Sequence, residues 1–163
     1  MASQSYAFRP MTAADLPTVR QWLGRAHVAE WWGDPSEQFK LVSEDLAHPS
    51  IDQFIVACDR RSFAYLQCYD PSAWPGHGFG PLTDGARGID QFIGEEDMIE
   101  RGHGSGFVRA FADRLLAAGV PQVLTDASPA NARAIKAYEK AGFCKLRSVD
   151  TPNGAALSMV RHP

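Results

Sequence analysis

The sequence predicts a mixed α/β (α+β) fold in which a central, mostly antiparallel sheet is flanked by helices. Three observations predict it: aromatic and β-branched runs typical of strands, amphipathic stretches at helical spacing, and tight turns that join neighbouring strands into hairpins. Interleaved strands and helices favour parallel pairing, whereas hairpins require antiparallel pairing. The sheet is therefore expected to be mixed.

Turn and capping residues set the boundaries of the expected elements. Thr12 is a typical N-cap residue, and Asp34 is followed by a proline, which is favoured at the first helical position. Glycines 24, 119 and 142 stand where helices are expected to end. The expected elements, in order, are a strand at 6–9, helices at about 12–24 and 35–47, strands at 54–58, 63–69 and 86–93, a helix at about 104–119, a strand at 123–125, a helix at about 128–142, and strands at 144–149 and 156–160.

The composition is that of a globular protein and excludes several other classes. The 163 residues are 45% apolar and 21% charged, which predicts one domain over residues 1–163 with a self-sufficient core. The apolar runs are too short to cross a bilayer. The net charge is −3 with no basic cluster, which argues against nucleic-acid partners and favours a cationic small molecule. A monomer and a homodimer both remain open.

Cysteine and histidine usage indicates neither a disulfide framework nor a metal site. The three cysteines are an odd count without a C-x-x-C pair, and the five histidines make no H-x-x-x-H pair. Cys58, Cys68 and Cys144 are expected to be small buried apolar residues rather than nucleophiles. The N-terminal stretch lacks a basic patch followed by an apolar run, so we expect no signal peptide and a cytoplasmic location.

A glycine-rich segment after the strand at 86–93 is the first candidate site. Arg101-Gly102-His103-Gly104-Ser105-Gly106 leads into a strongly amphipathic helix. A helix N-terminus exposes unpaired N–H groups and a partial positive charge, which suits a phosphate, and Arg101 adds a full charge. The dinucleotide fingerprint is excluded because Phe107 and Arg109 stand where it needs glycine, and no P-loop is present. The alternative is an ordinary turn that starts a helix.

A second candidate segment lies between Ser128 and Phe143. Asn131 and Tyr138 are seven residues apart, nearly two helical turns, so they share one face of the expected helix. A polar amide and a phenol aligned in this way can line a groove. The alternative is an Asn in a helix cap and a Tyr at the edge of the core.

Together the two segments resemble the GNAT acetyltransferase superfamily. The resemblance rests on Arg101-x-x-Gly104-x-Gly106 followed by Asn131-x-Arg133-Ala134-x-x-x-Tyr138-Glu139-Lys140-x-Gly142-Phe143. It implies a GNAT fold and acetyl-CoA as co-substrate; the cysteine and histidine pattern separately predicts no metal. The main-chain amides of Gly102, His103, Gly104, Ser105 and Gly106 would hold the pyrophosphate together with Arg101. Asn131 would contact pantetheine, Tyr138 would lie near the thioester sulfur, and the main chain of Gln91, Phe92 and Ile93 would bond to pantetheine.

Further motifs are similar to the aminoglycoside 6′-N-acetyltransferase branch. They are Glu30-Trp31-Trp32-Gly33, Arg87-Gly88-Ile89-Asp90-Gln91, Thr125-Asp126-x-Ser128-Pro129 and Thr151-Pro152-x-Gly154. Related siderophore-type acyltransferases share part of the pattern. The resemblance covers nearly the whole chain from residue 6 onward. It implies acetylation of the 6′-amine of aminoglycoside antibiotics, and hence antibiotic resistance.

The expected chemistry requires a carboxylate base. An alkyl amine with a pKa of about 10.4 is protonated at pH 7, and deprotonating it costs about 4.6 kcal/mol. Asp90 is the candidate general base, and Asp126 would orient the cationic substrate; the resemblance places active-site acids at both positions. A main-chain N–H of the strand at 88–93 is the candidate oxyanion donor, and Tyr138 the candidate acid for the leaving thiolate. The alternatives are that Asp126 caps the next turn, Asp90 pairs with a basic residue and Tyr138 packs in the core.

The sequence leaves three hypotheses open: acetylation of aminoglycosides, acetylation of another amine, and no catalysis. The Pro- and Gly-rich segment 70–85 is expected to be a functional flap, and its stretch 76–85 carries a single acid, Asp84. The resembled branch tends to be acid-rich there, so the departure favours another amine or hydroxylamine, such as a polyamine, a siderophore precursor or a protein N-terminus. A non-catalytic acyl-CoA-binding module is the third reading.

Aromatic and histidine side chains complete the candidate site. Trp31 and Trp32 are candidate substrate-binding residues that could stack on a sugar ring, although one of the pair is expected in the core. Asp84 is a third substrate-binding candidate. His77 and His103 lie in glycine-rich contexts and are expected to be solvated rather than catalytic.

Overall fold

The computed structural model describes residues 4–163, so the first three residues of the predicted domain lie outside the described part. In this part the strands are hydrogen-bonded in the order β1-β2-β3-β4-β5-β7-β6. The pair of β4 and β5 is parallel, whereas β1 with β2, β5 with β7 and β6 with β7 are antiparallel. The predicted mixed, mostly antiparallel sheet with helices is confirmed. The elements are β1 (Tyr6–Pro10), η1 (Ala13–Asp15), α1 (Leu16–Leu23), α2 (Ala26–Trp32), α3 (Pro35–Asp45), β2 (Ile51–Cys58), β3 (Arg61–Tyr69), η2 (Pro71–Ala73), β4 (Arg87–Ile93), η3 (Glu96–Met98), α4 (His103–Ala117), β5 (Val123–Ala127), α5 (Ala132–Lys140), β6 (Cys144–Thr151) and β7 (Gly154–Arg161).

Contacts divide the chain into two compact units, and the division falls within β4. The first unit comprises Met1–Cys68 and Gln91–Arg101, and the second comprises Tyr69–Asp90 and Gly102–Pro163. The single-domain organisation expected from the sequence stays a prediction.

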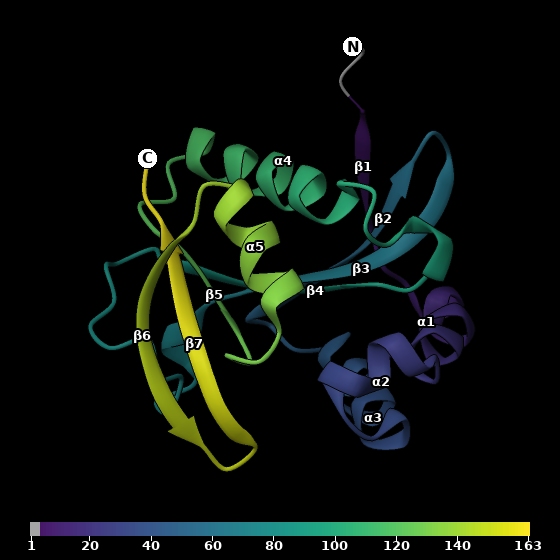
Figure 1. Ribbon diagram of the computed structural model, residues 1–163, viewed down its shortest axis with the longest axis horizontal. Coiled ribbons are helices and arrows are strands. Elements are labelled where there is room, and N and C mark those ends of the chain that lie inside the picture. The colour runs from purple at the N-terminus through teal and green to yellow at the C-terminus, as the bar shows by residue number, and fades with distance from the viewer. Residues whose placement is uncertain (1–3) are drawn as a thin grey trace. The chain divides into compact units, whose positions relative to one another are not determined.

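The first unit holds β1, β2, most of β3 and the three N-terminal helices, which lie together in Figure 1. The hairpin of β2 and β3 turns at Asp59 and Arg60, whose φ angles of 49° and 69° are those of a tight primed turn. The core of the unit forms between the helices and the strands, with partly buried side chains at its edge. Its buried members are Met11, Val19, Trp22, Leu23, Val28, Val42, Ile55, Tyr65 and Phe92.

The short helix α2 was not expected. It has seven residues, and Arg25 at its N-cap makes no side-chain capping bond. Gly24 ends α1 as predicted, but the chain re-enters a helix two residues later. Without a capping residue, the local sequence carried no signal for this second start.

The second unit holds β5, β6, β7 and two helices, α4 and α5, which lie side by side (Figure 1). Phe79 of the flap packs with Ala86, Leu124 and Val160 in a buried cluster. The helix expected from residue 128 begins four residues later. The chain first makes a turn in which Ser128 Oγ accepts a hydrogen bond from Ala130 N at 3.3 Å.

Candidate active site

Two carboxylates occupy equivalent positions on the parallel strands β4 and β5 of the second unit. Arg87 pairs with Val123 and Gly88 with Leu124, so the same register places Asp90 level with Asp126. Residues opposite each other on neighbouring strands point to the same face of a sheet. Counted on from this register, the two acids that the sequence proposed as base and substrate anchor stand at the same position along their two strands.

The main chains of β4 and β5 pair at two successive residue positions, and a side-chain hydrogen bond joins the strands at the next position along the chain. Thr125 is fully buried, and its Oγ1 donates to the main-chain oxygen of Ile89 at 2.8 Å. The two acids follow directly after this bond. A threonine at this position thus ties the strands together at the last level before the carboxylates.

Asp126 is accessible to solvent but crowded by protein. The residue is exposed, yet desolvation by its surroundings raises the pKa of its carboxyl above the usual value for aspartate. A carboxyl that lines a concave surface can be reached by solvent and still be surrounded by enough protein to lose part of its hydration. A raised pKa makes the carboxylate a better proton acceptor. The capping alternative for Asp126 is not favoured, because Ser128 holds the following turn.

An aromatic wall lies next to Asp90. Gly88 and Asp90 point to the same side of β4, and a Cβ on Gly88 would lie 2.4 Å from Cζ of Tyr69. The Tyr69 ring therefore covers Gly88, and its edge meets the ring of Trp74 at a centroid distance of 5.6 Å. Glycine at position 88 is required by this close approach.

At the N-terminus of α4, fewer main-chain amides are available to bind an anion than the sequence predicted. Gly102 is the N-cap in the left-handed region at φ 81°, which suits glycine. Gly106 N donates to Gly102 O at 3.0 Å, so its amide is committed to the helix. The first-turn amides of His103, Gly104 and Ser105 are the ones that a helix leaves for an anion.

His103 corrects an expectation. Its side chain is 6% exposed, so it is buried rather than solvated. The reason is geometric: it is the first residue of α4, and its side chain turns inward while its main chain stays at the helix end. His77 is half-buried, and its Nδ1 accepts from Phe79 N at 2.9 Å, which stabilises the flap.

Asn131 and Tyr138 lie at opposite ends of α5. Asn131 is the N-cap, and its Oδ1 accepts from Ala134 N at 3.2 Å, which leaves the amide nitrogen as its donor. Tyr138 is 4% exposed, and its ring meets Phe143 at 5.7 Å. Both residues therefore have the structural roles that the sequence kept as alternatives, and these roles are compatible with a ligand contact at Asn131.

Two arginines that the sequence reasoning missed hold the C-terminal end of α5. Arg161 of β7 donates through Nη1 to Ala141 O at 3.2 Å, and Arg109 of α4 donates to Lys140 O. Arg161 also forms an ion pair with Asp113. Last-turn carbonyls favour cations, so these contacts fix the helix that carries Tyr138. Their sequence positions, far from α5, gave no signal.

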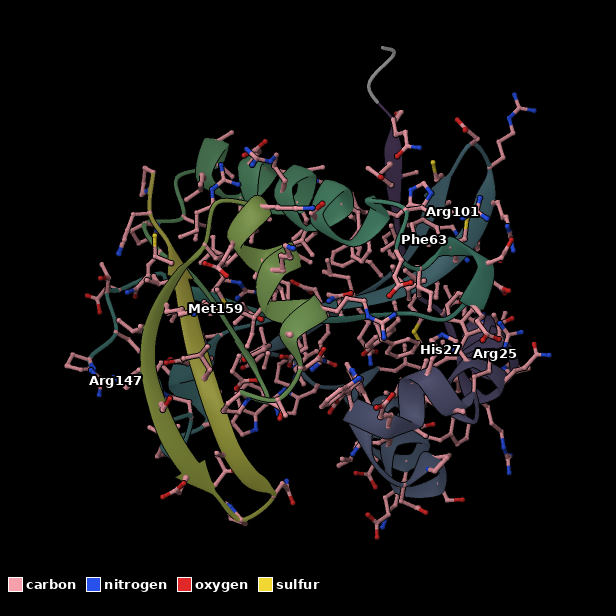
Figure 2. All side chains as sticks on the ribbon, in the orientation of Figure 1. Arg25, His27, Phe63, Arg101, Arg147 and Met159 are labelled. Atoms are coloured by element: carbon pink, nitrogen blue, oxygen red, sulfur yellow. The ribbon has the colours of Figure 1, made fainter. Side chains whose placement is uncertain are left out.

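In the first unit, the second half of β4 alternates between core and surface. Phe92 is 5% exposed and stacks on Tyr65 at 5.3 Å, whereas Gln91 and Ile93 are half-buried. The main-chain oxygen of Ile93 already contacts Nε2 of His27 at 2.9 Å. This contact occupies one acceptor position of the carbonyl of Ile93, one of the three residues expected to bond to pantetheine. Figure 2 shows His27 beside Arg25 in the same region.

The two tryptophans of α2 divide as the sequence suggested. Trp32 is half-buried and packs against the core residues Phe92 at 5.0 Å and Tyr65 at 6.1 Å, so it is the member of the pair that faces the core. Trp31 is 37% exposed, so its ring is available to a ligand.

Asp84 lies on the exposed flap of the second unit. It lines a cavity of about 160 Å³ together with Asp70 and Arg87. The hydrogen bonds from Ser72 hold the pKa of the Asp70 carboxyl below its usual range, and the Arg87 charge adds to this effect. The cavity is smaller than the roughly 300–1,000 Å³ of a drug-sized ligand site. It can hold one substituent of a substrate at most.

The cysteine expectation is correct at two positions and wrong at the third. Cys58 and Cys68 are buried, whereas Cys144 is exposed. Cys144 is the first residue of the edge strand β6, most of which is exposed, so the sheet has no layer to cover it. Within residues 4–163, no helix is long and apolar enough to cross a membrane, and no group of three metal-binding side chains occurs.

Comparison with known proteins identifies the family. Residues 11–151 match the model of the acetyltransferase (GNAT) domain, and the chain belongs to the GNAT acetyltransferase family. An aminoglycoside N(6′)-acetyltransferase type 1 from Klebsiella pneumoniae is 35% identical over an alignment of 171 residues, which covers 98% of this chain and 84% of that protein. Within the family, the chain therefore groups with the aminoglycoside N(6′)-acetyltransferases.

Solved structures agree with this assignment. The structure of AAC(6′)-Ib in complex with paromomycin and acetyl-CoA superposes with a TM-score of 0.86 at 34% identity, covering 97% of this chain and 93% of that one. The complex of AAC(6′)-Ib with coenzyme A and kanamycin gives a TM-score of 0.85 at 34% identity, with coverage of 97% and 95%. The GNAT resemblance and the GNAT fold predicted from the sequence are confirmed.

Proposed function

We propose that this chain transfers the acetyl group of acetyl-CoA directly to the 6′-amine of aminoglycoside antibiotics, with a carboxylate as general base. The observation that carries the proposal is the alignment of Asp90 and Asp126 on neighbouring parallel strands, directly after the Thr125–Ile89 bond. One carboxylate can take the proton that the acceptor amine must lose, while the other holds the cationic substrate. The kanamycin and paromomycin complexes of AAC(6′)-Ib support this choice of acceptor.

In the proposed reaction Asp90 accepts a proton from the ammonium group, directly or through a water molecule. The free amine then attacks the thioester carbonyl, and the oxyanion is stabilised by a main-chain N–H of the 88–93 stretch. The tetrahedral intermediate loses the second proton of its nitrogen to solvent, the C–S bond breaks, and the thiolate takes a proton from the candidate donor Tyr138, which then regains one from solvent. Asp126 orients the amine, and its raised pKa also suits it to share the proton.

Acetyl-CoA would be held by main-chain and charged groups. The amides of His103, Gly104 and Ser105 are the proposed pyrophosphate donors, since Gly106 N is committed to the helix. The exposed Arg101, with Gly102 giving the turn, would add the charge. Asn131 and the main chain of 91–93 would hold the pantetheine arm.

A second acceptor class remains a candidate because of the flap. Its stretch 76–85 carries the single acid Asp84, and aminoglycosides are polycations that favour several carboxylates. This observation favours an amine of lower charge, such as a polyamine or a hydroxylamine precursor. Trp31 and Asp84 are the proposed acceptor contacts outside the catalytic acids, and Trp32, which packs on Phe92, anchors the helix that carries Trp31.

We further propose a single domain that acts in the cytoplasm as a monomer or homodimer. The three free cysteines support a reducing compartment.

A thiol-release assay tests the function. Acetyl-CoA is mixed with kanamycin, tobramycin, spermidine, hydroxylysine or a short peptide, and the released thiol is followed. We expect turnover of kanamycin with the acetyl group mapped to the 6′-amine by mass spectrometry and NMR. Turnover of spermidine or hydroxylysine alone would move the chain to the second acceptor class, and acetyl-CoA binding without turnover would contradict the proposed catalysis.

The base assignment has its own test. Asp90→Asn is expected to lower kcat by orders of magnitude while coenzyme A still binds. Wild-type kinetics across the pH range in this variant would overturn the assignment.

A further inference from the structure

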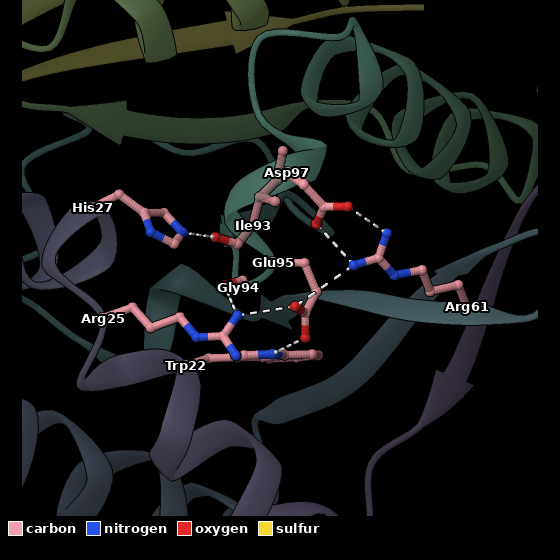
Figure 3. A network of polar contacts seen from close by, with 8 residues as sticks. All are labelled: Trp22, Arg25, His27, Arg61, Ile93, Gly94, Glu95 and Asp97. Carbon is pink, nitrogen blue, oxygen red and sulfur yellow. Dashed lines mark hydrogen bonds and ion pairs between the residues drawn. The ribbon is translucent and has the colours of Figure 1, made fainter.

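Glu95 lies at the centre of a polar network in the first unit, at the point where β4 ends (Figure 3). Its Oε1 accepts from Trp22 Nε1 at 2.9 Å, and its Oε2 accepts from Arg25 Nη1 at 2.9 Å. Arg61 Nη2 lies 3.7 Å from the same Oε2. The carboxylate thus joins side chains from α1, the α1–α2 junction and β3.

The same side chains also grip the main chain next to Glu95. Arg25 donates to Gly94 O at 2.8 Å, and His27 Nε2 contacts Ile93 O at 2.9 Å. On the opposite side of the peptide units, Gly94 N and Glu95 N both donate to Phe63 O, at 2.8 and 3.2 Å. We refer to Trp22, Arg25, His27 and Glu95 as the Glu95 clamp. It leaves the exit of β4 little freedom to rotate.

Trp22 sets the path of the chain through the clamp. A Cβ on Gly94 would lie 2.1 Å from Cγ of Trp22, so the backbone of Gly94 runs directly over the indole ring. Trp22 itself is 1% exposed and is held in the core of the unit. The indole ring therefore packs against the backbone of Gly94, while its Nε1 holds the Glu95 carboxylate by a hydrogen bond.

A second ion pair continues the connection toward Arg101. Arg61 donates to both oxygens of Asp97 at 2.8 and 2.7 Å, which fixes η3 to β3. This connector leads from β4 to the loop that precedes α4. The segment between the strand and the loop is therefore anchored at both Glu95 and Asp97.

The network contributes little to stability, because exposed and half-exposed ion pairs gain little net free energy once the desolvation of their charges is counted. The geometry that such pairs fix can matter far more, since a displacement of about 1 Å at a reacting centre can lower the rate about 100-fold. The main chain fixed here follows directly after Gln91, Phe92 and Ile93.

We propose that Glu95 is a positioning residue for acetyl transfer: through Trp22 and Arg25 it sets the main-chain exit of β4 and so aligns acetyl-CoA. This inference rests on the proposed function, because it takes the main chain of 91–93 as the pantetheine contact. Glu95 does not touch the substrate in this proposal and acts through the clamp.

The test compares Glu95→Gln and Glu95→Ala with a matched control. Asp15 forms a bidentate pair with Arg9 at 2.9 and 2.7 Å in the same unit, but it lies at the start of the helical region rather than on the β4 exit. Asp15→Asn is therefore the control for loss of an ion pair as such. Coenzyme A affinity is measured by calorimetry, and kcat and KM by thiol release, at a temperature where each variant is fully folded by circular dichroism.

We expect Glu95→Ala to weaken coenzyme A binding about tenfold and to lower kcat/KM for acetyl-CoA by ~10–100-fold. Glu95→Gln, which keeps the bond from Trp22 Nε1, is expected to lose less, and Asp15→Asn to lose stability alone. In a double-mutant cycle, the variant that combines Arg25→Met with Glu95→Ala is expected to lose no more coenzyme A affinity and kcat/KM than the more impaired of the two single variants.

Either of two results overturns the inference: wild-type affinity and kinetics in folded Glu95→Ala, or additive losses in the cycle. A wild-type protein that fails to bind coenzyme A would instead contradict the proposed function, so the two failures are distinguishable.

Discussion

Thr125 Oγ1 donates a hydrogen bond to Ile89 O at 2.8 Å, one residue before Asp126 on β5 and one residue before Asp90 on β4. Both partners are fully buried. Thr125→Val keeps the shape of the side chain but leaves a buried carbonyl unsatisfied, which costs about 1–3 kcal/mol. We expect this loss in chemical denaturation, together with a lower kcat because both acids follow the broken link. Thr18→Val on the exposed face of α1 is the control and should change neither quantity; an unaltered kcat in Thr125→Val would separate the bond from catalysis.

Replacing Asp126 is expected to raise stability while it lowers activity. Desolvation raises the pKa of Asp126 in the folded protein above its unfolded value. Charging the carboxyl therefore costs more in the folded protein than in the unfolded chain. The free energy of unfolding falls as the pH rises from the usual aspartate pKa through the raised folded pKa, and below the usual pKa the effect is absent. Asp126→Asn should have a higher melting temperature than the wild type at pH 7 and an equal one near pH 3. Melting curves from pH 3 to 8 test this sign, and a variant less stable at pH 7 would contradict it.

Two substitutions at Asn131 separate its role as a helix cap from its proposed contact with pantetheine. Its Oδ1 accepts from Ala134 N. Asn131→Asp keeps this acceptor, so the free energy of unfolding should stay within a few tenths of a kcal/mol, whereas Asn131→Ala should lose about 1 kcal/mol. Both variants remove the amide donor, and we expect both to raise the KM for acetyl-CoA. If only Asn131→Ala changes the KM, the residue acts through the helix alone.

How far the sequence predicts this site depends on whether the signal is local. The glycine-rich turn and Arg101 mark the start of α4 because the spacing itself dictates an exposed set of amides. Asp90 and Asp126 each stand at a strand end in the sequence, but their alignment follows from a register that local patterns do not specify. The commitment of Gly106 N to the helix likewise required the main-chain geometry.

The residues that sequence reasoning missed act across long sequence separations. Glu95 bonds to Trp22, 73 residues away, and Arg161 bonds to Ala141, 20 residues away. No periodicity or capping pattern encodes such pairs, because each partner is unremarkable in its own segment. The helix α2 was missed for a different reason, since it starts at Ala26 without a capping side chain.

The acid sensitivity of the first unit should depend on Glu95. Hydrogen bonds from Trp22 and Arg25 hold the pKa of the Glu95 carboxyl below its usual range. A lowered folded pKa contributes stability above the usual glutamate pKa, and this contribution is lost as the pH falls through the folded value. Stability of the wild type should therefore fall more steeply below pH 4.5 than that of Glu95→Gln. Parallel curves for the two proteins between pH 2.5 and 5 would show that the carboxylate contributes no linkage.

Arg161 is expected to control α5 and, through it, Tyr138. Its Nη1 donates to Ala141 O, and a Cβ on Gly142 would lie 3.1 Å from its Nε, so the side chain lies flat on the end of the helix. Arg161→Lys keeps the charge at the negative end of the helix but loses the planar group that spans Ala141 and Asp113. We expect a loss of about 1–2 kcal/mol in urea denaturation. Because Tyr138 lies in the last turn of the helix, kcat should also fall while coenzyme A affinity is kept.

Arg114→Lys makes the same change at an exposed position of α4 and is the control. It should leave the free energy of unfolding and kcat near the wild-type values, and equal losses in this control would show that Arg161 has no special role.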